Sequence, residues 1–397
     1  MSIKAVRIGD LFPRIQIGGT PPRGNSNYFG GQHVWVSIRD MEGKAIITDS
    51  SEHISDAGVA NSNCKLVSKG SLLFSFKLTV GRVAFAGVDL YTNEAIAAFD
   101  LAEARRRGIS LDYLSLILPV IAKGDTTKNS MGAALLNKDK IANLEIPLPP
   151  IDDQVQISAH LKAQLAAVEE ARQAAQKQAG EIKRLFPAIL KDTFDGLHDV
   201  KWIAIGDLAK TTSGSTPSRG LKEYWEPPTH PWVKTGEVVF SPIYKTEEAV
   251  SERALFECSI SLLPVGTVLV AMYGQGKTRG QSAVLKLPAT TNQACFAILP
   301  NERFDPEYIQ FWLHHAYLAL RELSESRGGN QANLNGELLN SFHVPLLPFH
   351  RQKNIAAQLQ KQLTIVDEIE AASAAQLIET ERLPARLLAQ AFNLNLE

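Results

Sequence analysis

The sequence is written twice, and this internal duplication constrains the fold more than any other feature. IGDL at residues 8–11 returns at residues 205–208, and TPPRGNSNYF from Thr20 returns as TPSRGLKEYW from Thr216. Self-similarity at a fixed period means that each copy is one structural unit. Because 397 residues are too many for one hydrophobic core of ordinary size, we expect two globular domains of related fold.

Each copy ends in a long helix-forming segment. Residues 152–186 and 351–383 are rich in Ala, Gln, Glu, Leu and Ile, and their apolar residues recur at spacings of four and three. A proline-rich stretch, IPLPP or VPLLP, precedes each segment. The positions that match at one constant offset are Gln154, Ile157, Leu161, Leu165, Val168, Arg184 and Leu185 in the first copy, and Gln352, Ile355, Leu359, Leu363, Val366, Arg382 and Leu383 in the second.

The spacing of these apolar residues predicts a narrow seam of the coiled-coil type. A helix of this extent is about 50 Å long at ~1.5 Å per residue, and a narrow seam must be buried against a similar surface. The other copy is the obvious partner. The alternative is that each segment is an ordinary amphipathic helix that packs on its own domain. The residues expected in the helix–helix contact are Ile157, Leu161, Leu165 and Val168, with Ile355, Leu359, Leu363 and Val366.

The globular parts have a mixed pattern that predicts an α+β fold. Strand-like runs such as VWVSI, SLLFSF and TVLVAMY lie between loops rich in Gly and Pro. Helical patterns lie near residues 111–122 and 306–326. The aromatic residues that recur in both halves are expected in the core, and they are Trp35, Trp232, Tyr28 and Tyr224.

Composition excludes several classes of protein. A net charge of −1 argues against a chain that coats nucleic acid indiscriminately. The widely spaced Cys64, Cys258 and Cys295 support neither a disulfide framework nor a metal knuckle, and His314 and His315 have no further ligand nearby in the sequence. No run approaches the ~20 apolar residues of a membrane-spanning helix. We therefore predict a cytoplasmic protein without a metal site and without membrane contact.

One short motif raises the question of nucleotide binding. AMYGQGKT at residues 271–278 fits the relaxed form of a phosphate-binding loop. Such a loop must open a helix, whereas RGQSAVLKLP follows here and predicts a strand. The aligned segment of the first half, SFKLTVGR, lacks Gly-Lys-Thr, and no apolar run ending in Asp follows to hold magnesium. The motif therefore predicts a polar loop between two strands.

Polar, glycine-rich loops recur in both halves. RGNSN, KGDTTKNS and SRGGNQANLN mix Arg or Lys with Asn, Gln and Thr, which hydrogen-bond phosphates and base edges. Any one such loop can also be a solvated connection without function. It is their accumulation in both copies that favours binding.

The duplicated segments resemble a known family. IPLPPIDDQVQISAHLKAQLAAVEE followed by IKRLFPAIL, repeated as VPLLPFHRQKNIAAQLQKQL followed by ERLPARLL, is similar to the conserved regions of the specificity subunit of type I restriction-modification systems. GGTPPRGNSNYFGGQHVWV and SGSTPSRGLKEYWEPPTHPWV look like the openings of that family's target recognition domains. Two departures are Arg351 where the first copy has Asp153, and a first domain that begins almost at Met1.

The resemblance implies an architecture. Residues 1–150 and 196–348 would be two target recognition domains of α/β character. Residues 151–195 and 349–397 would be the central and distal conserved helical regions, which pack as an antiparallel coiled coil. The helices would fix the spacer between two DNA half-sites and dock the methyltransferase subunits. Helices of about 50 Å exceed the ~34 Å of one DNA turn, which suits two reading domains on one face of the duplex.

The resemblance also implies a non-catalytic DNA-reading subunit. Each recognition domain would bind one half of a split, asymmetric sequence in double-stranded DNA. S-adenosylmethionine, ATP and magnesium would be bound by partner subunits, which are the methyltransferase and an ATP-driven restriction subunit. The residues themselves agree, because the sequence lacks an N-P-P-Y-like tetrad for adenine methylation, a nuclease carboxylate cluster with a following lysine, and a helicase loop.

We take the candidate DNA-binding residues from the polar loops. Phosphate contacts are expected to outnumber base contacts among them. No catalytic residue is assigned. The candidates are Arg23, Asn25, Lys77, Arg82 and Lys128 in the first domain, and Arg219, Lys222, Gln275, Lys277, Arg279, Arg327 and Gln331 in the second.

Three hypotheses remain open on the sequence. The first is the DNA-specificity subunit, the second is a duplicated coiled-coil scaffold that binds only protein partners, and the third is a nucleotide-dependent enzyme. A scaffold would show no salt-sensitive DNA affinity. The half-site sequences cannot be read from the chain, because recognition depends on loop geometry and DNA shape as well as on side chains.

Overall fold

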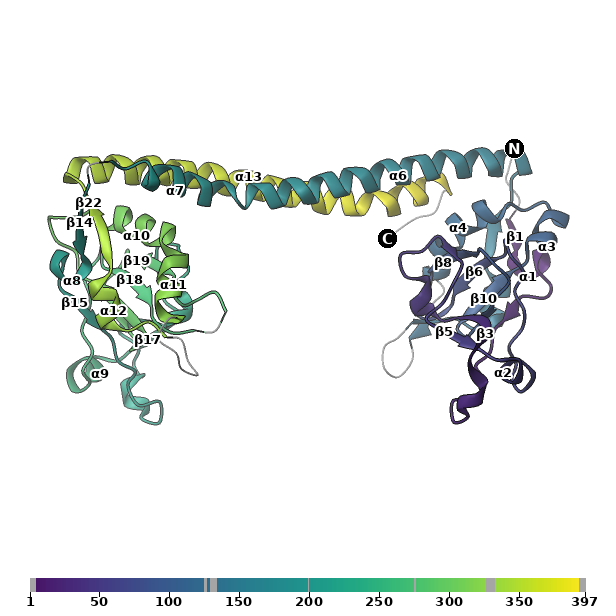
Figure 1. The fold of residues 1–397 in the computed structure, drawn as a ribbon, viewed down its shortest axis with the longest axis horizontal. Helices are drawn as coiled ribbons and strands as arrows, with labels where there is room; N and C mark the ends of the chain where they lie inside the picture. Colours follow the sequence, from purple (N-terminus) through teal and green to yellow (C-terminus); the bar gives the residue numbers. More distant parts are fainter. Residues whose placement is uncertain are drawn as a thin grey trace. The chain divides into compact units, whose positions relative to one another are not determined.

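The computed structural model describes residues 5–124, 127–128, 134–198, 200–274, 276–325 and 333–392. The chain divides into two compact units. The first unit holds residues 1–175 and 376–397, and the second holds residues 176–375. Both borders between the units fall inside long helices, so each unit contains one end of each helix (Figure 1).

The first unit is built around a five-stranded sheet with the strand order β2-β10-β6-β8-β4. Its central strand β6 is buried along its whole length, and α4 packs beside β8 and β13. The elements in chain order are β1 (Ala5–Arg7), α1 (Ile8–Leu11), β2 (Gln16–Ile17), η1 (Ser26–Tyr28), β3 (Phe29–Val36), η2 (Ile38–Met41), β4 (Ile46–Ile47), β5 (Glu52–Ile54), α2 (Asp56–Ala60), β6 (Leu72–Ser75), β7 (Lys77–Leu78), β8 (Val83–Ala86), β9 (Tyr91–Thr92), β10 (Ile96–Phe99), α3 (Leu101–Arg106), α4 (Leu111–Gly124), β11 (Thr127–Lys128), β12 (Ala134–Leu135), α5 (Lys138–Asn143), β13 (Glu145–Pro147) and α6 (Ile151–Ile182).

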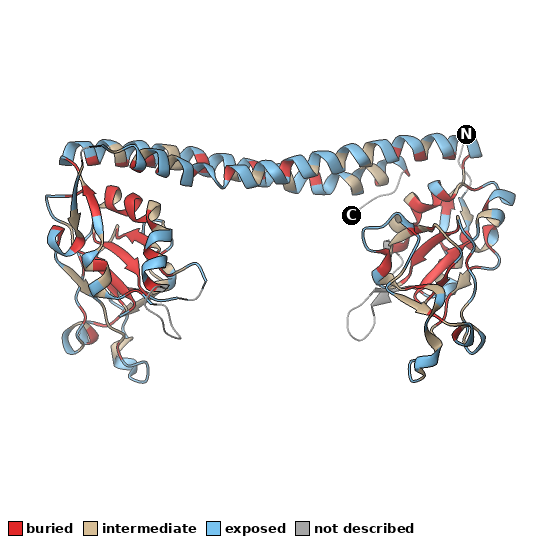
Figure 2. Ribbon diagram, viewed as in Figure 1, coloured by how far each residue is buried: buried red, intermediate tan, exposed pale blue. Residues whose placement is uncertain are grey.

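The second unit repeats this plan around a four-stranded sheet with the order β15-β21-β18-β19. Buried side chains fill both faces of its central strands (Figure 2). Its elements are α7 (Leu185–Asp195), β14 (Lys201–Ala204), α8 (Ile205–Leu208), β15 (Thr211–Ser213), η3 (Lys222–Tyr224), β16 (His230–Val233), η4 (Thr235–Glu237), β17 (Glu248–Val250), α9 (Glu252–Glu257), β18 (Val268–Ala271), β19 (Ser282–Val284), β20 (Thr290–Thr291), β21 (Cys295–Ile298), α10 (Pro306–His315), α11 (Tyr317–Glu325), α12 (Gly336–Ser341), β22 (His343–Leu346) and α13 (Phe349–Ala391).

The two units share most of their described strands, which confirms the duplicated α+β fold, but only the first unit has β4 in its main sheet and the small sheet β11-β12-β7. A smaller sheet in each unit joins an antiparallel hairpin-like pair to a parallel strand, in the orders β5-β3-β9 and β17-β16-β20. Trp35 of β3 and Trp232 of β16 take the same place and are 1% and 2% exposed, as expected for core aromatics. Tyr28 and Tyr224 are only half-buried. The large buried rings anchor the smaller sheet to the rest of each unit.

The buried residues of the long helices follow the spacing expected of a seam, whereas contact between the named seam residues of the two helices stays a prediction. Buried side chains in α6 and α13 recur at alternating steps of three and four residues, as in Gln154, Ser158 and Leu161. In the first unit Leu161 of α6 and Phe392, which follows α13, belong to one core, and in the second unit Phe186 and Leu190 of α7 share a core with Ala356 and Leu359 near the start of α13 (Figure 1). Within a unit the helices therefore run antiparallel. Of the seam residues named from the sequence, Leu161, Leu359 and Val366 are buried, and Ile157, Leu165, Val168, Ile355 and Leu363 are half-buried.

One helix differs from the sequence pattern. The first helical segment was expected to run without a break, but α6 ends at Ile182 and α7 begins at Leu185. Pro187 explains the break, because proline has no N–H for the carbonyl of Lys183 and its ring clashes there. Similarly, the pattern at residues 306–326 forms two helices, α10 and α11, separated at Ala316.

A buried glutamine ties the start of each long helix to its domain. The Gln154 side chain is 0% exposed. Its Oε1 accepts the N–H of Ser110 at 2.8 Å, and its Nε2 donates to the carbonyls of Gly108 at 3.0 Å and Pro149 at 2.8 Å. These groups lie in the loop before α4 and in the proline-rich stretch before α6. One side chain thus satisfies three buried backbone groups, which fixes the direction in which the helix leaves the domain.

The second copy has the same arrangement. Gln352 is 0% exposed, its Oε1 accepts the N–H of Asp305 at 2.9 Å, and its Nε2 donates to the carbonyls of Arg303 at 3.0 Å and Leu347 at 2.8 Å. The ring of Tyr308 lies nearby in the fold, and its hydroxyl donates to the Pro345 carbonyl at 3.0 Å. The repeated glutamine of the sequence is therefore a structural clamp.

Replacing either glutamine should destabilise the protein strongly. Gln154→Ala and Gln352→Ala each leave buried backbone groups without partners, which costs roughly 2–5 kcal/mol. We expect the thermal unfolding temperature to fall by roughly 10 °C in a calorimetric scan. The exposed neighbours Gln156 and Gln358 provide matched controls, and their replacement by Ala should shift the transition only slightly. Equal shifts for clamp and control variants would contradict the clamp.

Candidate nucleic-acid interface

The candidate interface lies where the backbone of a glycine-containing loop contacts the last residue of a short strand, β9 in the first unit and β20 in the second. In the first unit the loop of residues 18–23 approaches residues 92–94, and the Gly19 N–H donates to the Thr92 carbonyl at 2.9 Å. A Cβ at Gly18 would lie 2.0 Å from that carbonyl oxygen, so that only glycine fits this contact. In the second unit Ser215 N–H donates to the Thr291 carbonyl at 3.0 Å, and a Cβ at Gly214 would lie 1.8 Å from the same oxygen.

A buried tryptophan donates a hydrogen bond to the backbone of this loop in each unit. Trp35 Nε1 donates to the Gly19 carbonyl at 3.0 Å, and Trp232 Nε1 donates to the Ser215 carbonyl at 3.2 Å. Because both rings belong to the buried small sheet, the loop rests on a rigid support. The two loops therefore present the same backbone in both domains.

Arg23, a candidate from the sequence, lies on this support. Its guanidinium forms an ion pair with both carboxylate oxygens of Glu52, including a hydrogen bond of 3.0 Å from Nη2, and lies 4.8 Å from the Phe29 ring centroid and 5.1 Å from that of Trp35. The hydrogen bond to Glu52 raises the pKa of Arg23, and that from Arg23 lowers the pKa of Glu52. The side chain of Arg23 is still 55% exposed.

Arg219 repeats the arrangement in the second unit. It forms an ion pair with Glu248, and its guanidinium lies 3.8 Å from the Trp225 ring centroid and 4.9 Å from that of Trp232. The hydrogen bond from Arg219 lowers the pKa of Glu248. A planar cation between a carboxylate and an aromatic face is held in one orientation. Both candidate arginines are thus fixed parts of the surface.

A threonine of the same loop donates a hydrogen bond to the second residue after the strand. The Thr20 hydroxyl donates to the Glu94 carboxylate, and the Thr216 hydroxyl donates to Gln293 Oε1 at 2.5 Å. Burial raises the pKa of Glu94, but the hydrogen bond from Thr20 and the charges of Lys77 and Arg23 outweigh burial, so that the pKa is lowered overall. Glu94 is consequently a carboxylate at neutral pH.

These side chains border a polar cavity in the first unit. It has a volume of 470 Å³, and Arg23, Lys77 and Glu94 line it together with Arg39 and Asn93. The structure therefore brings together two of the sequence candidates, Arg23 and Lys77. Cations, a carboxylate and an amide at one open surface provide both donors and acceptors, which suits base edges as well as phosphates.

Other candidates of the first domain have local partners. Asn25 caps η1 by accepting the Asn27 N–H at 3.1 Å. Arg82 donates to the Ile38 carbonyl at 3.0 Å and pairs with Glu42 at 3.3 Å. Lys128 lies in β11, but its side chain is outside the described part of the chain.

The second-domain candidates come from three loops, of which the structure describes candidates in two. Lys222 is exposed at the start of η3, and Lys277 is exposed between β18 and β19. Arg279, in contrast, is only 8% exposed, so that its side chain is part of the packing of the loop. Gln275, Arg327 and Gln331 lie outside the described residues. For all twelve candidates, contact with DNA stays a prediction.

The loop that resembles a phosphate-binding loop joins two strands, as the sequence predicted. β18 precedes it and β19 follows it, so no helix opens there to bind an anion. The Tyr317 hydroxyl donates to the Lys277 carbonyl at 2.6 Å, and Arg321 donates to the Gly276 carbonyl at 2.7 Å. Side chains of α11 therefore fix the backbone of this loop while Lys277 projects from it.

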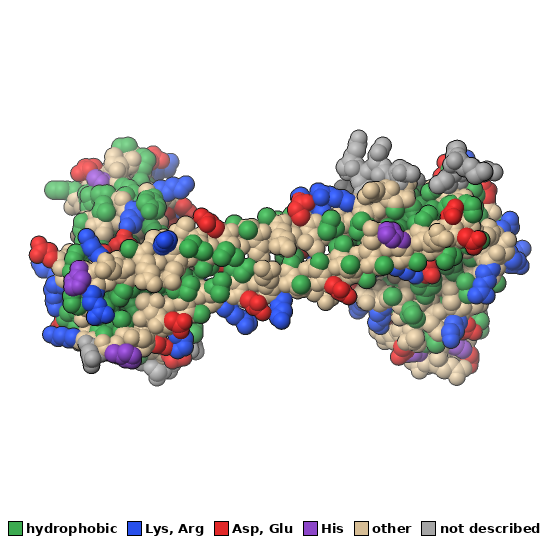
Figure 3. Space-filling model, turned by 90° about the horizontal axis from the view of Figure 1, so that it is seen from above, with side chains coloured by type: hydrophobic (Ala, Val, Ile, Leu, Met, Phe, Trp, Pro, Cys, Tyr) green, Lys and Arg blue, Asp and Glu red, His purple; other side chains and the backbone are tan. Residues whose placement is uncertain are grey.

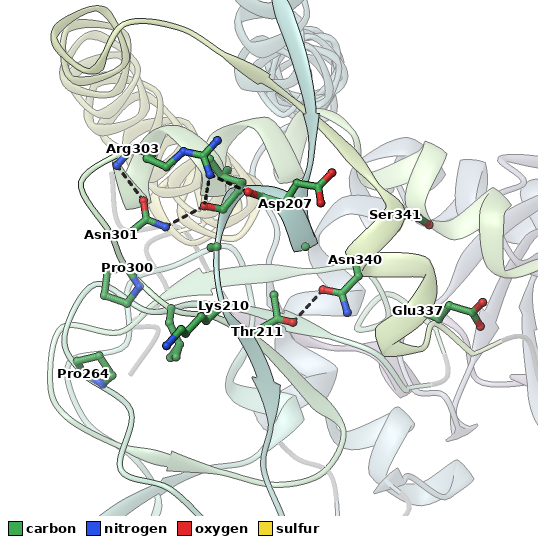
Figure 4. Close-up of a pocket in the computed structure, with 14 residues that line it drawn as sticks. Asp207, Lys210, Thr211, Pro264, Pro300, Asn301, Arg303, Glu337, Asn340 and Ser341 are labelled. Atoms are coloured by element: carbon green, nitrogen blue, oxygen red, sulfur yellow. Dashed lines mark hydrogen bonds between the residues drawn. The ribbon is translucent and has the colours of Figure 1, made fainter.

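The second unit also contains an open cavity of 1440 Å³ at the ends of α8 and α12 (Figure 4). Its polar side chains point at neighbouring backbone: Arg303 donates to the Asp207 carbonyl at 2.7 Å and Asn301 to the Leu208 carbonyl at 2.9 Å. Thr211 donates to Asn340 at 2.8 Å. Its described lining contains none of the candidate DNA-binding residues. These contacts stabilise the junction between α8 and the loop before α10.

The histidines considered as metal ligands have other surroundings. His314 stacks on Phe240 with ring centroids 3.7 Å apart, and burial lowers its pKa to about 4. His315 pairs with Asp195 at 3.2 Å. Within the described residues there is no group of three or more His, Cys, Asp or Glu that could hold a metal ion. Nor is any described helix long and apolar enough to cross a membrane.

Sequence reasoning missed the partners of the arginines and threonines. Glu52, Glu248, Glu94 and Gln293 were not among the candidates, although TNEA and TNQA stand at equivalent places in the two repeats. A comparison of the repeats for equivalent positions with different polar residues would have found the pair Glu94 and Gln293. The arginine–glutamate pairs, in contrast, join a loop to the first residue of a strand that is 29 residues away in the sequence, and they had no local signal.

Comparison with known proteins identifies the family. Residues 2–176 and 198–379 each match the domain described as "Type I restriction modification DNA specificity domain". The chain belongs to this family. Curated relatives include the EcoR124I/EcoR124II specificity subunit of Escherichia coli, 26% identical over 172 residues, and the MjaIX specificity subunit of Methanocaldococcus jannaschii, 32% identical over 165 residues. The alignments cover 43% and 41% of this chain, and 43% and 37% of the relatives' own length.

Solved structures of similar fold cover nearly the whole chain. One, which concerns complex assembly and conformational transition of the type I R-M system, has a TM-score of 0.74 at 18% identity and covers 98% of this chain and 97% of its own. Another, the HsdS subunit from Thermoanaerobacter tengcongensis, has a TM-score of 0.62 at 18% identity and covers 99% and 97%. The resemblance inferred from the sequence is thus confirmed, and each unit carries one DNA specificity domain.

The close approach of Gly18 to the Thr92 carbonyl can be tested by substitution. Gly18→Ala should push the loop off the Thr92 carbonyl and destabilise the first domain by roughly 2–4 kcal/mol. Gly24 directly follows this loop, and a Cβ there would meet nothing within 4 Å, so Gly24→Ala is the matched control. Hydrogen exchange of residues 18–25 should accelerate in Gly18→Ala only. Unchanged exchange in that variant would show that the loop does not depend on this contact.

Proposed function

We propose that this chain is the DNA-reading specificity subunit of a type I restriction-modification complex. Each specificity domain would read one half of a bipartite, asymmetric target in double-stranded DNA. The observation that carries the proposal is the repeated surface of the two domains, where an arginine fixed on aromatic rings lies beside a threonine-bound Glu94 or Gln293. Two related surfaces with different reading groups suit two different half-sites.

We further propose that the chain is not itself catalytic and binds no cofactor. Methylation with S-adenosylmethionine would be performed by methyltransferase subunits, and ATP- and magnesium-dependent cleavage by a restriction subunit. The state of two of the described side chains agrees with this proposal. Burial raises the pKa of Cys295 to about 12, so that its thiol stays protonated. Burial likewise raises the pKa of Tyr113 to about 12, and its hydroxyl is engaged by the Pro147 carbonyl at 2.8 Å.

The long helices would act as spacer and as docking surface. The seam residues face the interior of each unit, so that the exposed apolar residues of α6 and α13 are better suited to hold a partner. Val155, Ile365, Ile369 and Ile378 are 53%, 45%, 41% and 50% exposed. In Figure 3, which looks onto the helices, hydrophobic side chains lie on the helical surface between charged ones. Such a surface fits a protein partner.

Mapping of methylated bases in the genome tests the function directly. In cells that carry the gene and its methyltransferase partner, we expect methylation at one split motif, and deletion of the gene should abolish methylation at that motif only. The motif would reveal both half-sites. An unchanged map after deletion, in cells where the partner subunits are expressed, would favour a scaffold that binds only proteins.

Lys277 provides a test of phosphate contact. Its side chain is exposed while its backbone is held by Tyr317, so Lys277→Ala should leave the fold intact. If Lys277 binds a phosphate, the slope of log affinity against log salt concentration should fall by about 1 in the variant complex. Lys177→Ala removes an equal charge from α6 and should leave the slope unchanged. Equal slopes for wild type and Lys277→Ala would exclude this lysine from phosphate binding.

A further inference from the structure

The two domains differ at one equivalent position of otherwise matching surfaces. Glu94 and Gln293 each lie in the turn after a parallel strand and accept a hydrogen bond from the hydroxyl of the loop threonine. Glu94 also lines one cavity with Arg23. Both are exposed, although the strand end before the turn, Thr92 or Thr291, and the residue that follows the exposed one, Ala95 or Ala294, are buried. In each domain, therefore, an exposed polar side chain projects from a turn whose neighbouring residues are packed in the core.

The backbone beneath this position is the same in both domains. Asn93 N–H donates to the Val36 carbonyl at 3.0 Å and Asn292 N–H to the Val233 carbonyl at 3.1 Å. The side chains of both asparagines cap the turn, accepting the N–H of Ala95 and of Ala294 at 3.1 Å each. Because the turn is the same, the difference between the two sites lies in the side-chain chemistry of Glu94 and Gln293.

That chemistry differs in hydrogen-bonding capacity. Glu94 is ionised and can only accept hydrogen bonds. Gln293 accepts from Thr216 through Oε1, and its amide nitrogen adds two donors. In the major groove, a carboxylate pairs with the exocyclic amino group of cytosine, whereas the amide of glutamine pairs with adenine through N6 and N7.

The neighbouring arginines are poor candidates for this reading role. Arg23 is engaged by both oxygens of Glu52, and Arg219 is paired with Glu248. Both lie over aromatic rings that hold them in place. Their contribution is to position the loop and to supply positive charge beside the reading group.

We propose that Glu94 and Gln293 are specificity-determining residues that read a base edge in each half-site, Glu94 the amino group of a cytosine and Gln293 an adenine. The assignment rests on the proposed function of the chain. Lys77 and Arg39, which line the same cavity as Glu94, supply donors for the adjacent phosphate or base. The threonine hydrogen bond fixes the reading group before DNA arrives, which lowers the entropic cost of the contact.

The reciprocal substitutions Glu94→Gln and Gln293→Glu test this proposal. Either new side chain retains an oxygen for the threonine hydroxyl, so the fold should persist. Each variant is assembled with the methyltransferase subunits, and its binding to duplexes with randomised half-sites is sequenced. We expect Glu94→Gln to change the preferred base at one position of one half-site by about ten- to a hundredfold, and Gln293→Glu to do so in the other half-site.

Controls separate base reading from a change of charge. Glu145→Gln removes one carboxylate from β13, outside the cavity lining, and should leave both half-sites unchanged. A uniform change of affinity over all sequences in Glu94→Gln would show that the residue acts only through its charge and would overturn the proposal. So would an unaltered preference at every position. If Glu94→Gln fails to assemble, Gln293→Glu alone decides.

The sequence preference of the wild-type complex distinguishes a failure of the proposed function from a failure of the assignment of Glu94 and Gln293. A wild-type complex that selects no bipartite sequence refutes the proposed function itself. A wild-type complex with a clear bipartite motif that neither substitution alters refutes only the assignment of Glu94 and Gln293.

Discussion

The buried glutamine at the start of each long helix fixes the helix to its globular domain, and the proposed role of the helices as a spacer depends on this contact. Gln154 and Gln352 each satisfy three backbone groups that water cannot reach, and these groups come from the helix start and from a loop of the globular domain. An amide is suited to this task because it combines a donor group with an acceptor in one plane. In both copies the clamp restrains the start of the helix against the domain beside it, as the proposed role of the helices as a spacer requires.

Much of the fold could be predicted because each local sequence pattern occurs in both copies, so that one copy supports the interpretation of the other. The mixed domains, the heptad-like seam and the strand after the glycine-rich loop all follow from short-range patterns. What could not be predicted depends on tertiary contacts. Whether Arg23 is free or paired is decided by Glu52, which lies on another strand. The burial of Arg279 likewise depends on how α11 packs over its loop. Periodicity also hid the break at Lys183, which a single proline causes.

The glycines of the two loops explain how one backbone can serve two different targets. Gly18 and Gly214 allow the loop to touch the strand end so closely that the position of the threonine behind it is fixed. Side chains at the exposed tips are then free to differ without altering the support. Base specificity can change by substitution at one such tip, because discrimination arises from a few hydrogen bonds. Under the proposed function, duplication followed by such changes would convert a symmetric pair of surfaces into a reader of an asymmetric sequence.

The ion pairs also bear on how strongly such a surface binds the wrong DNA. Nonspecific affinity grows with the number of phosphates that Lys and Arg neutralise. Here Glu52 and Glu248 offset the charges of Arg23 and Arg219, and the whole chain carries a net charge of −1. Under the proposed function, attraction to the phosphate backbone would be moderate, and a larger share of the binding free energy would come from contacts with bases. A subunit that selects one sequence among many gains from this balance, since the ratio of specific to nonspecific affinity determines where it is bound.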